Sequence, residues 1–337
     1  MKVLVTGGAG YIGSHTIVEM MAAGMEPVIV DNFSNSQPEV LERLREITGR
    51  TISFREADVS DPSSMRSIFA AIQPEAVIHF AAHKAVSESV QAPSQYYRNN
   101  LGAVLTVAEM MIEFGTPNLV FSSSATVYGD PKQVPVTEDA PLRATNPYGQ
   151  TKLMGEQILR DMAAAYPSIG VTILRYFNPV GAHESGLIGE NPTGQPNNIM
   201  PMIAQVAAGI RDNLLVYGND YPTADGTGVR DYIHVVDLSK AHIRALLKQA
   251  GKAGVCTYNL GAGQGYSVLE LVKAFEQASG KKIKCVVAPR RDGDVAACFA
   301  DPTLAKRELG WEAAKTLSDM CADVWRWQAN NPNGYLG

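Results

Sequence analysis

Six short runs rich in β-branched residues recur through the first half of the chain, with stretches of helical character between them. The runs read KVLVT, PVIVD, TISF, AVIHF, NLVFSS and VTILRYF, and Ser14 to Ala23 and Ala103 to Phe114 are examples of the helical stretches. Repeated β-α units form parallel sheets, because each helix returns the chain across a face of the sheet. The pattern predicts an α/β fold with a Rossmann-type doubly wound parallel sheet.

The pattern changes after about Asn178. The segment NPVGAHESGLIGENPTGQPNN is rich in Gly, Pro and Asn, and long irregular segments inside compact domains are usually functional. Mixed helices and short strands follow it. The 337 residues suffice for two domains. We expect residues 1–177 to form the cofactor domain and residues 178–337 a smaller mixed α/β substrate domain, with some segments returning to the first.

The end of the first strand carries the glycine spacing of a dinucleotide-binding turn. In VLVTGGAGYIG, Gly7, Gly10 and Gly13 are three residues apart, and a helix is expected to open at Tyr11 or Ile12. Glycines at these positions permit a tight turn, close approach to a pyrophosphate, and close packing of helix on strand. The helix N-terminus then faces the phosphates.

An acid closes the second strand about 20 residues further on. Asp31 is placed to bond a ribose hydroxyl, and the residues after it include Asn32, Asn35 and Ser36 but no arginine for a 2′-phosphate. NAD is therefore favoured over NADP, with these residues as cofactor-binding candidates.

Other cofactor-binding candidates follow later strands at the carboxyl edge of the sheet, where ligands of such folds lie. Asp58 and Val59 are placed to border the adenine, although an Asp in this setting is often a helix cap or turn residue. The remaining candidates near this edge are Phe80, Ala81, Ala82, Lys84 and Asn99. Small side chains at positions 81 and 82 would let the backbone come close to the cofactor.

The stretch NPYGQTK predicts the start of another helix. Asn146 is a good N-cap and Pro147 suits the first helical position. Tyr148 and Lys152 are then neighbours on one helical face, and a tyrosine in the first turn feels the positive end of the helix dipole. Taken alone, the same spacing also fits an ordinary helix with a half-buried tyrosine and a solvated lysine.

Composition excludes several classes of protein. The net charge is −5 with 19 % charged residues and no basic cluster beyond small groups such as Lys281, Lys282 and Lys284, so no nucleic-acid partner is expected. No run is long and uncharged enough to span a bilayer, and no signal peptide is recognised. The four cysteines are far apart, without paired motifs or interleaved histidines, which indicates no metal site and reduced thiols in a cytoplasmic protein.

The motifs TGGAGYIG, FSSSATVYGD, NPYGQTK, RYFNPVGAH, GTGVRDYIHV and APRRDGD occur together and in this order. With them the chain closely resembles the UDP-glucose 4-epimerase (UDP-galactose 4-epimerase) family of the extended short-chain dehydrogenases/reductases. The resemblance runs nearly end to end. It implies an NAD-dependent isomerase that oxidises carbon 4 of a UDP-hexose transiently and reduces it on the opposite face, with Tyr148 and Lys152 as the catalytic pair.

The chemistry explains why such a pair is needed. Removing hydride from a sugar carbinol requires a base for the hydroxyl proton. A free tyrosine has a pKa near ~10, so only about one in a thousand is phenolate at pH 7. Lowering this pKa to about 7 requires about 4 kcal/mol of differential stabilisation of the phenolate. An ammonium, the positive nicotinamide and the helix N-terminus could supply it. By resemblance, Lys152 also bonds the nicotinamide ribose.

The resemblance also assigns Ser124, which would bond the reacting hydroxyl and relay its proton. Next to it, Ala125 and Thr126 stand about where sugar-nucleotide 4,6-dehydratases carry an Asp-Glu pair, which weakens that alternative. Thr126 is kept as a substrate-binding candidate. A non-catalytic NAD-sensing protein on the same fold is the alternative from another class, but it has no reason to keep the Tyr-Lys pair.

For the substrate end, the resemblance implies a set of contacts to the UDP-sugar. Phe177 would lie against the nicotinamide, Asn178 would bind the diphosphate or sugar, and Tyr217 would stack on the uracil. Arginine forks suit phosphate oxygens, so Arg230 and Arg291 would clamp the diphosphate. The remaining candidates are Asn197, Asn198 and Ile199 over the sugar, and Asp294 on the uridine ribose.

Two positions bear on specificity and packing. Cys298 matches the family position beside the substituent on carbon 2, where a small residue leaves room for an N-acetyl group, so UDP-N-acetylglucosamine and UDP-N-acetylgalactosamine are expected as further substrates. Ala82 and His83 stand where many epimerases have Gly and Leu, which predicts altered packing against the cofactor, with His83 as a local hydrogen-bonder. A homodimer through helices of the cofactor domain is expected by resemblance.

Overall fold

The computed structural model describes residues 1–194, 196–291 and 293–336. Its larger sheet has seven strands, and every neighbouring pair is parallel. In spatial order the strands are β10 (Gly254–Leu260), β6 (Gly170–Tyr176), β5 (Asn118–Ser124), β4 (Ala76–His79), β1 (Lys2–Thr6), β2 (Glu26–Asp31) and β3 (Ser53–Glu56). The six strands expected from the sequence are all present.

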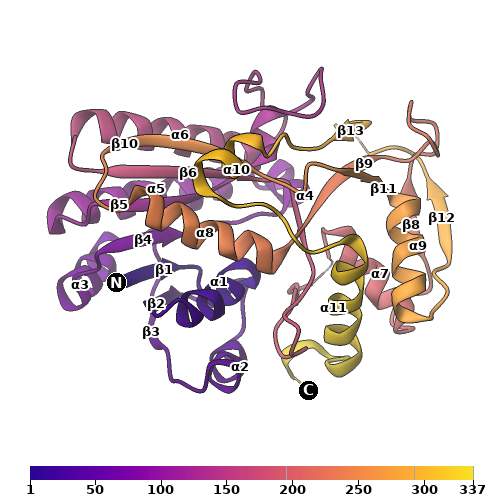
Figure 1. Ribbon diagram of the computed structural model, residues 1–337, viewed down its shortest axis with the longest axis horizontal. Helices are drawn as coiled ribbons and strands as arrows, with labels where there is room; N and C mark the ends of the chain where they lie inside the picture. The colour runs from indigo at the N-terminus through magenta and orange to yellow at the C-terminus, as the bar shows by residue number, and fades with distance from the viewer. Residues whose placement is uncertain (195, 292, 337) are drawn as a thin grey trace.

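Helices cover both faces of this sheet (Figure 1). On one side lie α1 (Tyr11–Ala22), α2 (Glu39–Thr48) and α8 (Val235–Gln249). On the other lie α3 (Pro62–Ile72), α5 (Pro93–Phe114) and α6 (Pro147–Ala165), with the short α4 (Val86–Gln91) beside α5 and α6. The doubly wound α/β class expected from the sequence is confirmed.

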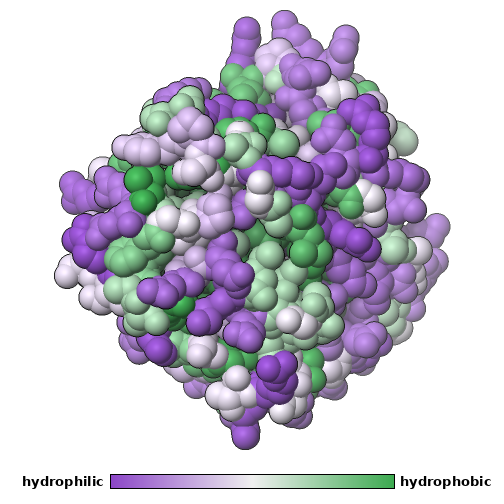
Figure 2. Space-filling model, turned by 60° about the vertical axis from the view of Figure 1, so that its left-hand side comes forward, coloured by the Kyte–Doolittle hydropathy of each residue, from purple (hydrophilic) through white to green (hydrophobic). Residues whose placement is uncertain are grey.

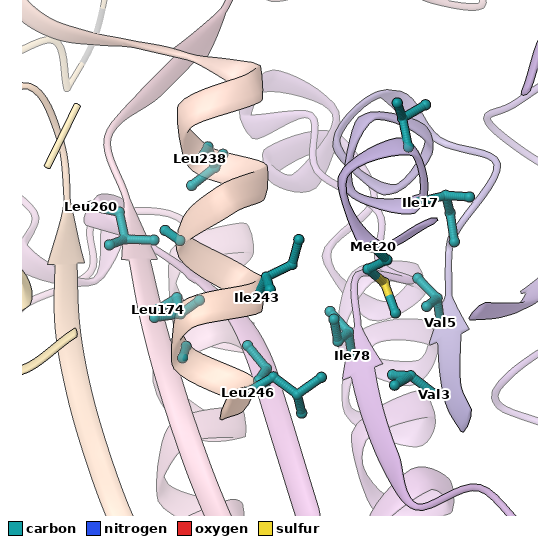
Figure 3. Packing of buried hydrophobic residues seen from close by; sticks show 14 of the residues in the cluster. Val3, Val5, Ile17, Met20, Ile78, Leu174, Leu238, Ile243, Leu246 and Leu260 are labelled. Atoms are coloured by element: carbon teal, nitrogen blue, oxygen red, sulfur yellow. The ribbon is translucent and has the colours of Figure 1, made fainter. Parts of the chain in front are cut away.

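Successive side chains of the central strands pack alternately into two separate hydrophobic cores. Val3 and Val5 pack with Ile17 and Leu246 on the side of α1 and α8, whereas Leu4 packs on the side of α3, α5 and α6. Figure 3 shows the first of these clusters, with side chains from β1, α1 and α8 meeting over the sheet. Because side chains alternate along a strand and both faces are covered, three consecutive apolar residues occupy the middle of β1 and are found in β4 and β5 as well.

The smaller part of the molecule combines short strands with helices. In the sheet that contains β9, β7 and β13 pair parallel to it and β11 antiparallel, and β8 pairs with β12 in a separate ladder. The strands are β7 (Asn178–Val180), β8 (Leu214–Tyr217), β9 (Val229–His234), β11 (Gly265–Ser267), β12 (Cys285–Ala288) and β13 (Ala297–Cys298). The helices of this part are α7 (Ile199–Ala207), α9 (Val268–Ser279) and α11 (Leu317–Asn330). Helix α10 (Thr303–Leu309) packs on β10 and α8 of the large body, and the 3-10 turns η1 (Ala125–Tyr128) and η2 (Gly334–Leu336) contact α6 and α2.

Two segments of the second half lie in the large sheet and its helical layer. Strand β10 forms the edge of the seven-stranded sheet beside β6, and α8 packs along α1. The large body is therefore built from residues 1–176 together with residues that follow the irregular segment.

The strand order reverses between β1 and β4, and the carboxyl edge at such a switch point is where sheets of this kind bind their ligands. Gly7 follows β1 with a φ of +68°, and a Cβ at this position would lie 2.7 Å from the backbone nitrogen of Ala81, which follows β4. Only glycine lets the two strand ends approach so closely. This edge is where the predicted cofactor residues converge.

Candidate active site

The turn between β1 and α1 has the geometry of a dinucleotide cradle. Helix α1 begins at Tyr11 after Gly10, which offers no side-chain cap, so the first backbone N–H groups of the helix point out of its end. A Cβ on Gly13 would lie 2.3 Å from the carbonyl oxygen of Gly7, so the helix packs close to the strand. These features fit the pyrophosphate of NAD, as the glycine spacing predicts.

Asp31 organises this cradle from the end of β2. Its carboxylate accepts hydrogen bonds from the backbone N–H of Ala9 at 3.0 Å, the N–H of Phe33 at 3.0 Å and the hydroxyl of Ser36 at 2.8 Å. The acid thus ties the glycine turn to the loop that follows β2. Asn32 in that loop is exposed, and Asn35 accepts from Thr193 of the irregular segment at 3.0 Å.

The candidates after β3 and β4 divide into turn residues and edge residues. Asp58 closes a turn by accepting from the N–H and hydroxyl of Ser60, and Val59 is buried in the core beneath it. Phe80 packs on His242, and Ala81 and Ala82 are partly buried at the strand end. These hydrogen bonds are typical of an ordinary turn residue, which is the alternative that the sequence around Asp58 also allows.

One residue that sequence reasoning missed holds this edge together. The side chain of Asn100 bonds both the backbone N–H and the carbonyl of His83, and its amide also donates to the Thr151 hydroxyl at 2.9 Å. The neighbouring candidate Asn99 donates to Asn100 at 3.0 Å. The repeated asparagines at 99 and 100 were the only sequence signal. The ring of His83 lies 5.4 Å from that of Tyr96, and its recorded hydrogen bonds are those of its backbone.

Helix α6 presents the Tyr-Lys pair as its sequence predicts. The Asn146 side chain caps the helix by accepting from the N–H of Gly149 at 2.8 Å, and Pro147 is the first helical residue. Lys152 is buried, its Nζ donates to the Ser122 carbonyl at 2.6 Å, and it lies 6.0 Å from the centre of the Tyr148 ring. The lysine is thus fixed behind the tyrosine by the end of β5.

Burial dominates the electrostatics of the pair. Burial raises the pKa of Tyr148 to about 12, and a hydrogen bond with Ser124 only partly opposes it. Burial likewise lowers the pKa of Lys152 to about 8, against the opposing charge of Glu156. The sequence argument expects a depressed tyrosine pKa. The groups of the protein itself do not produce it, because desolvation disfavours the phenolate more than nearby dipoles favour it.

Ser124 stands beside the pair at the end of β5. Strand register places it opposite Tyr176 of β6, and its hydroxyl interacts with the backbone N–H and the hydroxyl of Thr126. Phe177 follows β6 and is buried, and Asn178 begins β7 directly after it. The end of β6 in the large sheet and the start of β7 in the smaller part are therefore only two residues apart in the chain.

A pocket in the smaller part gathers the predicted substrate residues. Its empty space, with the open mouth included, is about 830 Å³. Eight predicted residues line it: Asn178, Asn197, Asn198, Ile199, Tyr217, Arg230, Arg291 and Asp294. Met202, Tyr221 and Tyr232 also line it and were missed, because no local motif distinguishes them from core residues.

The two arginines of this pocket share one acid. Asp294 lies 3.3 Å from Arg230 and 2.9 Å from Arg291, and the Arg291 guanidinium lies 4.7 Å from the centre of the Tyr217 ring. Two guanidinium groups from distant positions in the sequence thus lie on one wall of the pocket. Such an arrangement suits a diphosphate.

Cys298 lies beside Arg230 of this wall and close to Phe177, which follows β6. On β13 it pairs with Arg230 of β9, and its buried side chain packs in a cluster with Phe177 and Val127. Burial raises the pKa of its thiol to about 11, so it is a neutral, small group. Among the described residues, all four cysteines are free.

The described residues contain no cluster of three or more His, Cys, Asp or Glu that could hold a metal ion. None of the helices in the described ranges is both long enough and apolar enough to cross a bilayer. On the face shown in Figure 2, hydrophobic and hydrophilic residues are interspersed.

Comparison with known proteins shows which proteins this chain is similar to. A family model described as GDP-mannose 4,6 dehydratase matches residues 4–324. The UDP-glucose 4-epimerase of Bacillus subtilis (strain 168) is 60% identical over 335 residues, which cover 99% of both chains. The structure of UDP-glucose 4-epimerase from Bifidobacterium longum in complex with NAD+ and UDP matches with a TM-score of 0.96 and 52% identity, covering 99% of this chain and 100% of that one.

A third similar structure is the UDP-Glc/GlcNAc 4-epimerase of Campylobacter jejuni, with a TM-score of 0.85 and 36% identity over 98% of this chain and 99% of that one. The family model is described as a dehydratase, whereas the end-to-end identity is to epimerases. On this identity, and with a glycine turn and a Tyr-Lys pair at the edge of the large sheet and an arginine-lined pocket in the smaller part, the chain belongs to the UDP-glucose 4-epimerase family.

Proposed function

We propose that this protein interconverts UDP-glucose and UDP-galactose by transient oxidation at carbon 4 of the sugar. The observation that carries the proposal is that Tyr148 and Lys152 lie at the end of β5, and that Asn178, two residues after the neighbouring strand β6, lines the pocket that holds Arg230 and Arg291. A base at a cofactor edge and a cationic wall beyond it suit a sugar nucleotide held by its diphosphate.

Each residue has a defined part in this reaction. Tyr148 takes the proton of the 4-hydroxyl, and the Ser124 hydroxyl bonds the same oxygen and relays the proton. When bound, NAD supplies the hydride acceptor and a positively charged ring near the phenol, and it returns the hydride, so there is no net redox change. Lys152 holds its ammonium behind the phenol through the Ser122 carbonyl.

The nucleotide end of the substrate must be held tightly, whereas the sugar end must be free to turn. Arg230 and Arg291 hold the diphosphate, with Tyr217 against the uracil and Asp294 on the ribose. The sugar site stays loose, because the 4-keto sugar must turn over before it is reduced on its opposite face. Around the cofactor, the residues that would hold NAD are the Gly7–Gly13 turn, Asp31 and the edge residues near Ala81, with Lys152 on the nicotinamide ribose.

The test is direct. The purified protein is incubated with UDP-galactose and no added NAD, and UDP-glucose is measured by coupled oxidation or chromatography. We expect UDP-glucose to form, because a cofactor that undergoes no net redox change can remain bound through turnover. If no UDP-glucose forms even after NAD is supplied, the proposal is wrong.

The family model's description favours a second candidate, 4,6-dehydration. That reaction eliminates water and needs an acid/base pair, whereas this chain has Ala125 and Thr126 beside Ser124. Neither side chain ionises near neutral pH, so neither can replace the Asp-Glu acid/base pair of the dehydratases. Formation of a stable 4-keto-6-deoxy sugar in the same incubation would favour the dehydratase.

We also propose that the protein acts on UDP-N-acetylglucosamine and UDP-N-acetylgalactosamine. The proposal is supported by the small side chain of Cys298, which packs in a cluster with Phe177, and by the Campylobacter jejuni relative, whose name includes UDP-GlcNAc beside UDP-Glc.

Finally, a cytoplasmic homodimer is proposed. The free cysteines suit a reducing compartment. The dimer is supported by exposed apolar side chains on α4 and α5, namely Val86, Val90 and Leu105. Light scattering on the purified protein measures the oligomeric state.

A further inference from the structure

The irregular segment between β7 and α7 crosses the cofactor end of the molecule. In Figure 1 it runs between α1 and α11. Hydrogen bonds tie it to both loops that flank the dinucleotide cradle: Tyr11 donates to the Gly181 carbonyl at 2.7 Å, Asn191 to Gln37 at 3.1 Å, Thr193 to Asn35 at 3.0 Å and Ser87 to Asn197 at 3.1 Å. One carboxylate lies in the middle of this segment.

That carboxylate, Glu190, joins the two ends of the site through a single oxygen. Its Oε1 accepts from the Lys84 ammonium at 3.0 Å and from the Asn198 amide nitrogen at 2.6 Å. Lys84 follows β4 at the cofactor edge, and Asn198 lines the substrate pocket. No other side chain among the described residues has recorded hydrogen bonds to both.

The environment of Glu190 distinguishes it from a surface ion pair. Its side chain is only 10% exposed, whereas the Lys84 side chain is 47% exposed. Ion pairs between fully exposed groups contribute little. A largely buried carboxylate without a partner is unfavourable, and the Lys84 ammonium supplies the partner cation here.

The bond to Asn198 fixes the amide. A carboxylate has no hydrogen to donate, so the nitrogen of the amide must face Glu190 and its oxygen is left as the free acceptor. Because Asn198 lines the pocket, that oxygen is available to a donor such as a sugar hydroxyl.

We propose that Glu190 is a positioning residue that holds the Lys84 ammonium at the cofactor edge and orients the Asn198 amide toward the sugar, and so couples the two ends of the site. The proposal rests on the proposed epimerase function for the identity of the ligands. Lys84 and Asn198 make the ligand contacts, and Glu190 acts through them.

Two substitutions separate the two roles. Glu190→Gln keeps an oxygen that can accept from Asn198 but removes the charge that pairs with Lys84. Glu190→Ala removes both contacts. Glu184→Gln is the matched control, because Glu184 is an exposed acid of the same segment whose side chain has no recorded hydrogen bond.

The measurements are made on the protein as purified. Bound NAD per protomer is followed during prolonged dialysis, and affinities for UDP and UDP-glucose are measured by calorimetry. For Glu190→Ala we expect about tenfold weaker binding of UDP-glucose with little change for UDP, together with faster loss of NAD. For Glu190→Gln we expect faster loss of NAD with UDP-glucose affinity near that of the wild type. Turnover should show the alanine effect in KM more than in kcat.

Wild-type NAD retention and UDP-glucose affinity in Glu190→Ala would overturn the proposal. So would equal weakening of UDP and UDP-glucose, since that would be a general loss of structure rather than a misplaced amide. If Glu190→Ala does not fold, Glu190→Gln still decides, because unchanged NAD retention in it contradicts the Lys84 role. Failure of the epimerase function is distinguishable, because it would appear as absent turnover in the wild type while the binding measurements stand.

Discussion

At the scale of single residues, the catalytic pair is defined by a conflict between burial and charge. Tyr148 has a pKa of about 12 and Lys152 a pKa of about 8, both displaced toward the neutral form by desolvation. A buried lysine that is anchored to a carbonyl remains close to the tyrosine in either charge state. The pair is thus held in place by the fold, and we expect the phenolate to depend on positive charge that arrives with the cofactor.

Tyr148→Phe should leave NAD bound and the fold intact but lower turnover by orders of magnitude, because it removes the base without opening a cavity. Turnover of UDP-galactose and the NAD content of the purified variant are the measurements. Activity close to that of the wild type would eliminate Tyr148 as the base.

Lys152→Met should lower turnover and raise the pH at which tyrosinate absorbance appears in the NAD-bound protein. The substitution removes the cation closest to the phenol while keeping most of the buried volume, so the phenolate loses stabilisation. Spectrophotometric titration of the variant and the wild type provides the comparison. An unchanged titration would show that Lys152 does not tune Tyr148.

Cys298→Tyr should abolish turnover of the N-acetylated substrates and largely spare UDP-galactose. A larger side chain can exclude a substituent strongly, whereas an unfilled pocket discriminates weakly against the smaller substrate. The ratio of kcat/KM for the two substrate pairs is measured in both proteins. Absent N-acetyl activity in the wild type, or retained activity in the variant, would show that Cys298 is not the gate.

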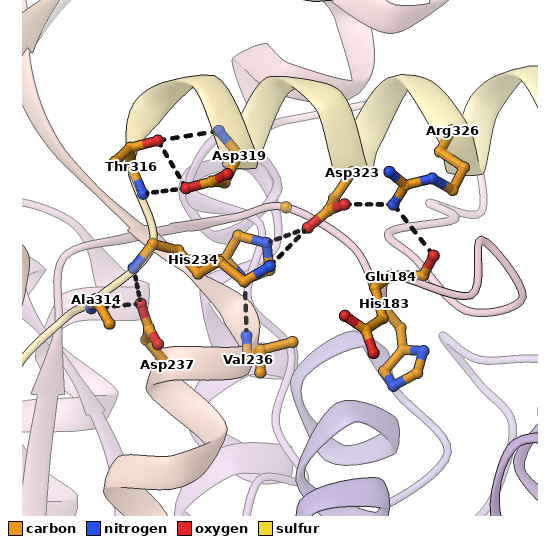
Figure 4. Close-up of polar contacts among 12 residues, drawn as sticks. His183, Glu184, His234, Val236, Asp237, Ala314, Thr316, Asp319, Asp323 and Arg326 are labelled. Carbon is orange, nitrogen blue, oxygen red and sulfur yellow. Dashed lines mark hydrogen bonds and ion pairs between the residues drawn. The ribbon is translucent and has the colours of Figure 1, made fainter.

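At the scale of elements, a buried polar network anchors helix α11 to the junction of β9 and α8 (Figure 4). His234 accepts from the N–H of Val236 through Nδ1, so it donates from Nε2 to Asp323 at 3.1 Å. Lys315 and Arg326 also pair with Asp323. A Cβ on Gly181 would lie 2.8 Å from the His234 ring, so this network also supports the start of the segment that carries Glu190.

Asp323→Asn should destabilise the fold at pH 7 by about 2 kcal/mol or more, because it removes a buried charge that three donors share. Burial alone would raise the pKa of Asp323, but the bonds from His234 and Arg326 and the charge of Lys315 hold it well below its ordinary value. The stabilisation is therefore present above the unfolded pKa of about 4 and is lost as pH falls below it.

Urea denaturation at several pH values tests this expectation. The free energies of unfolding of the wild type and Asp323→Asn should converge below about pH 4. Asp319→Asn on the same helix is the control, because Asp319 is only partly buried and caps its own helix through Thr316, so about 1 kcal/mol is expected. A constant difference at all pH values would refute the electrostatic account.

At the scale of the whole molecule, we propose that residues 1–177 bind the cofactor and residues 178–337 the UDP-sugar, but not as independently folding units. Strand β10 covers the edge of β6, and α8 covers Leu174 and Ile17 in the core shown in Figure 3. A chain ending at residue 177 would expose that core.

A fragment of residues 1–177 should therefore fail to fold on its own. Circular dichroism with thermal unfolding, and proton NMR dispersion, would show the absence of a cooperative fold. The full-length chain is the control. A stable fragment that binds NAD would contradict this view of the interface.

Much of this molecule follows from short stretches of sequence. The six strands, the glycine turn after Thr6 and the capped helix with Tyr148 and Lys152 depend on spacing within a few residues, and local spacing is visible in the chain itself. The pairing of Lys152 with Ser122, the carboxylate shared by Lys84 and Asn198, and the addition of β10 to the sheet join residues 30 to more than 100 positions apart. Nothing local marks such partners, since they are chosen by how the packed elements place side chains. The sequence by itself therefore determined the fold class and the residues proposed to react, whereas only the tertiary structure decided what holds those residues in position.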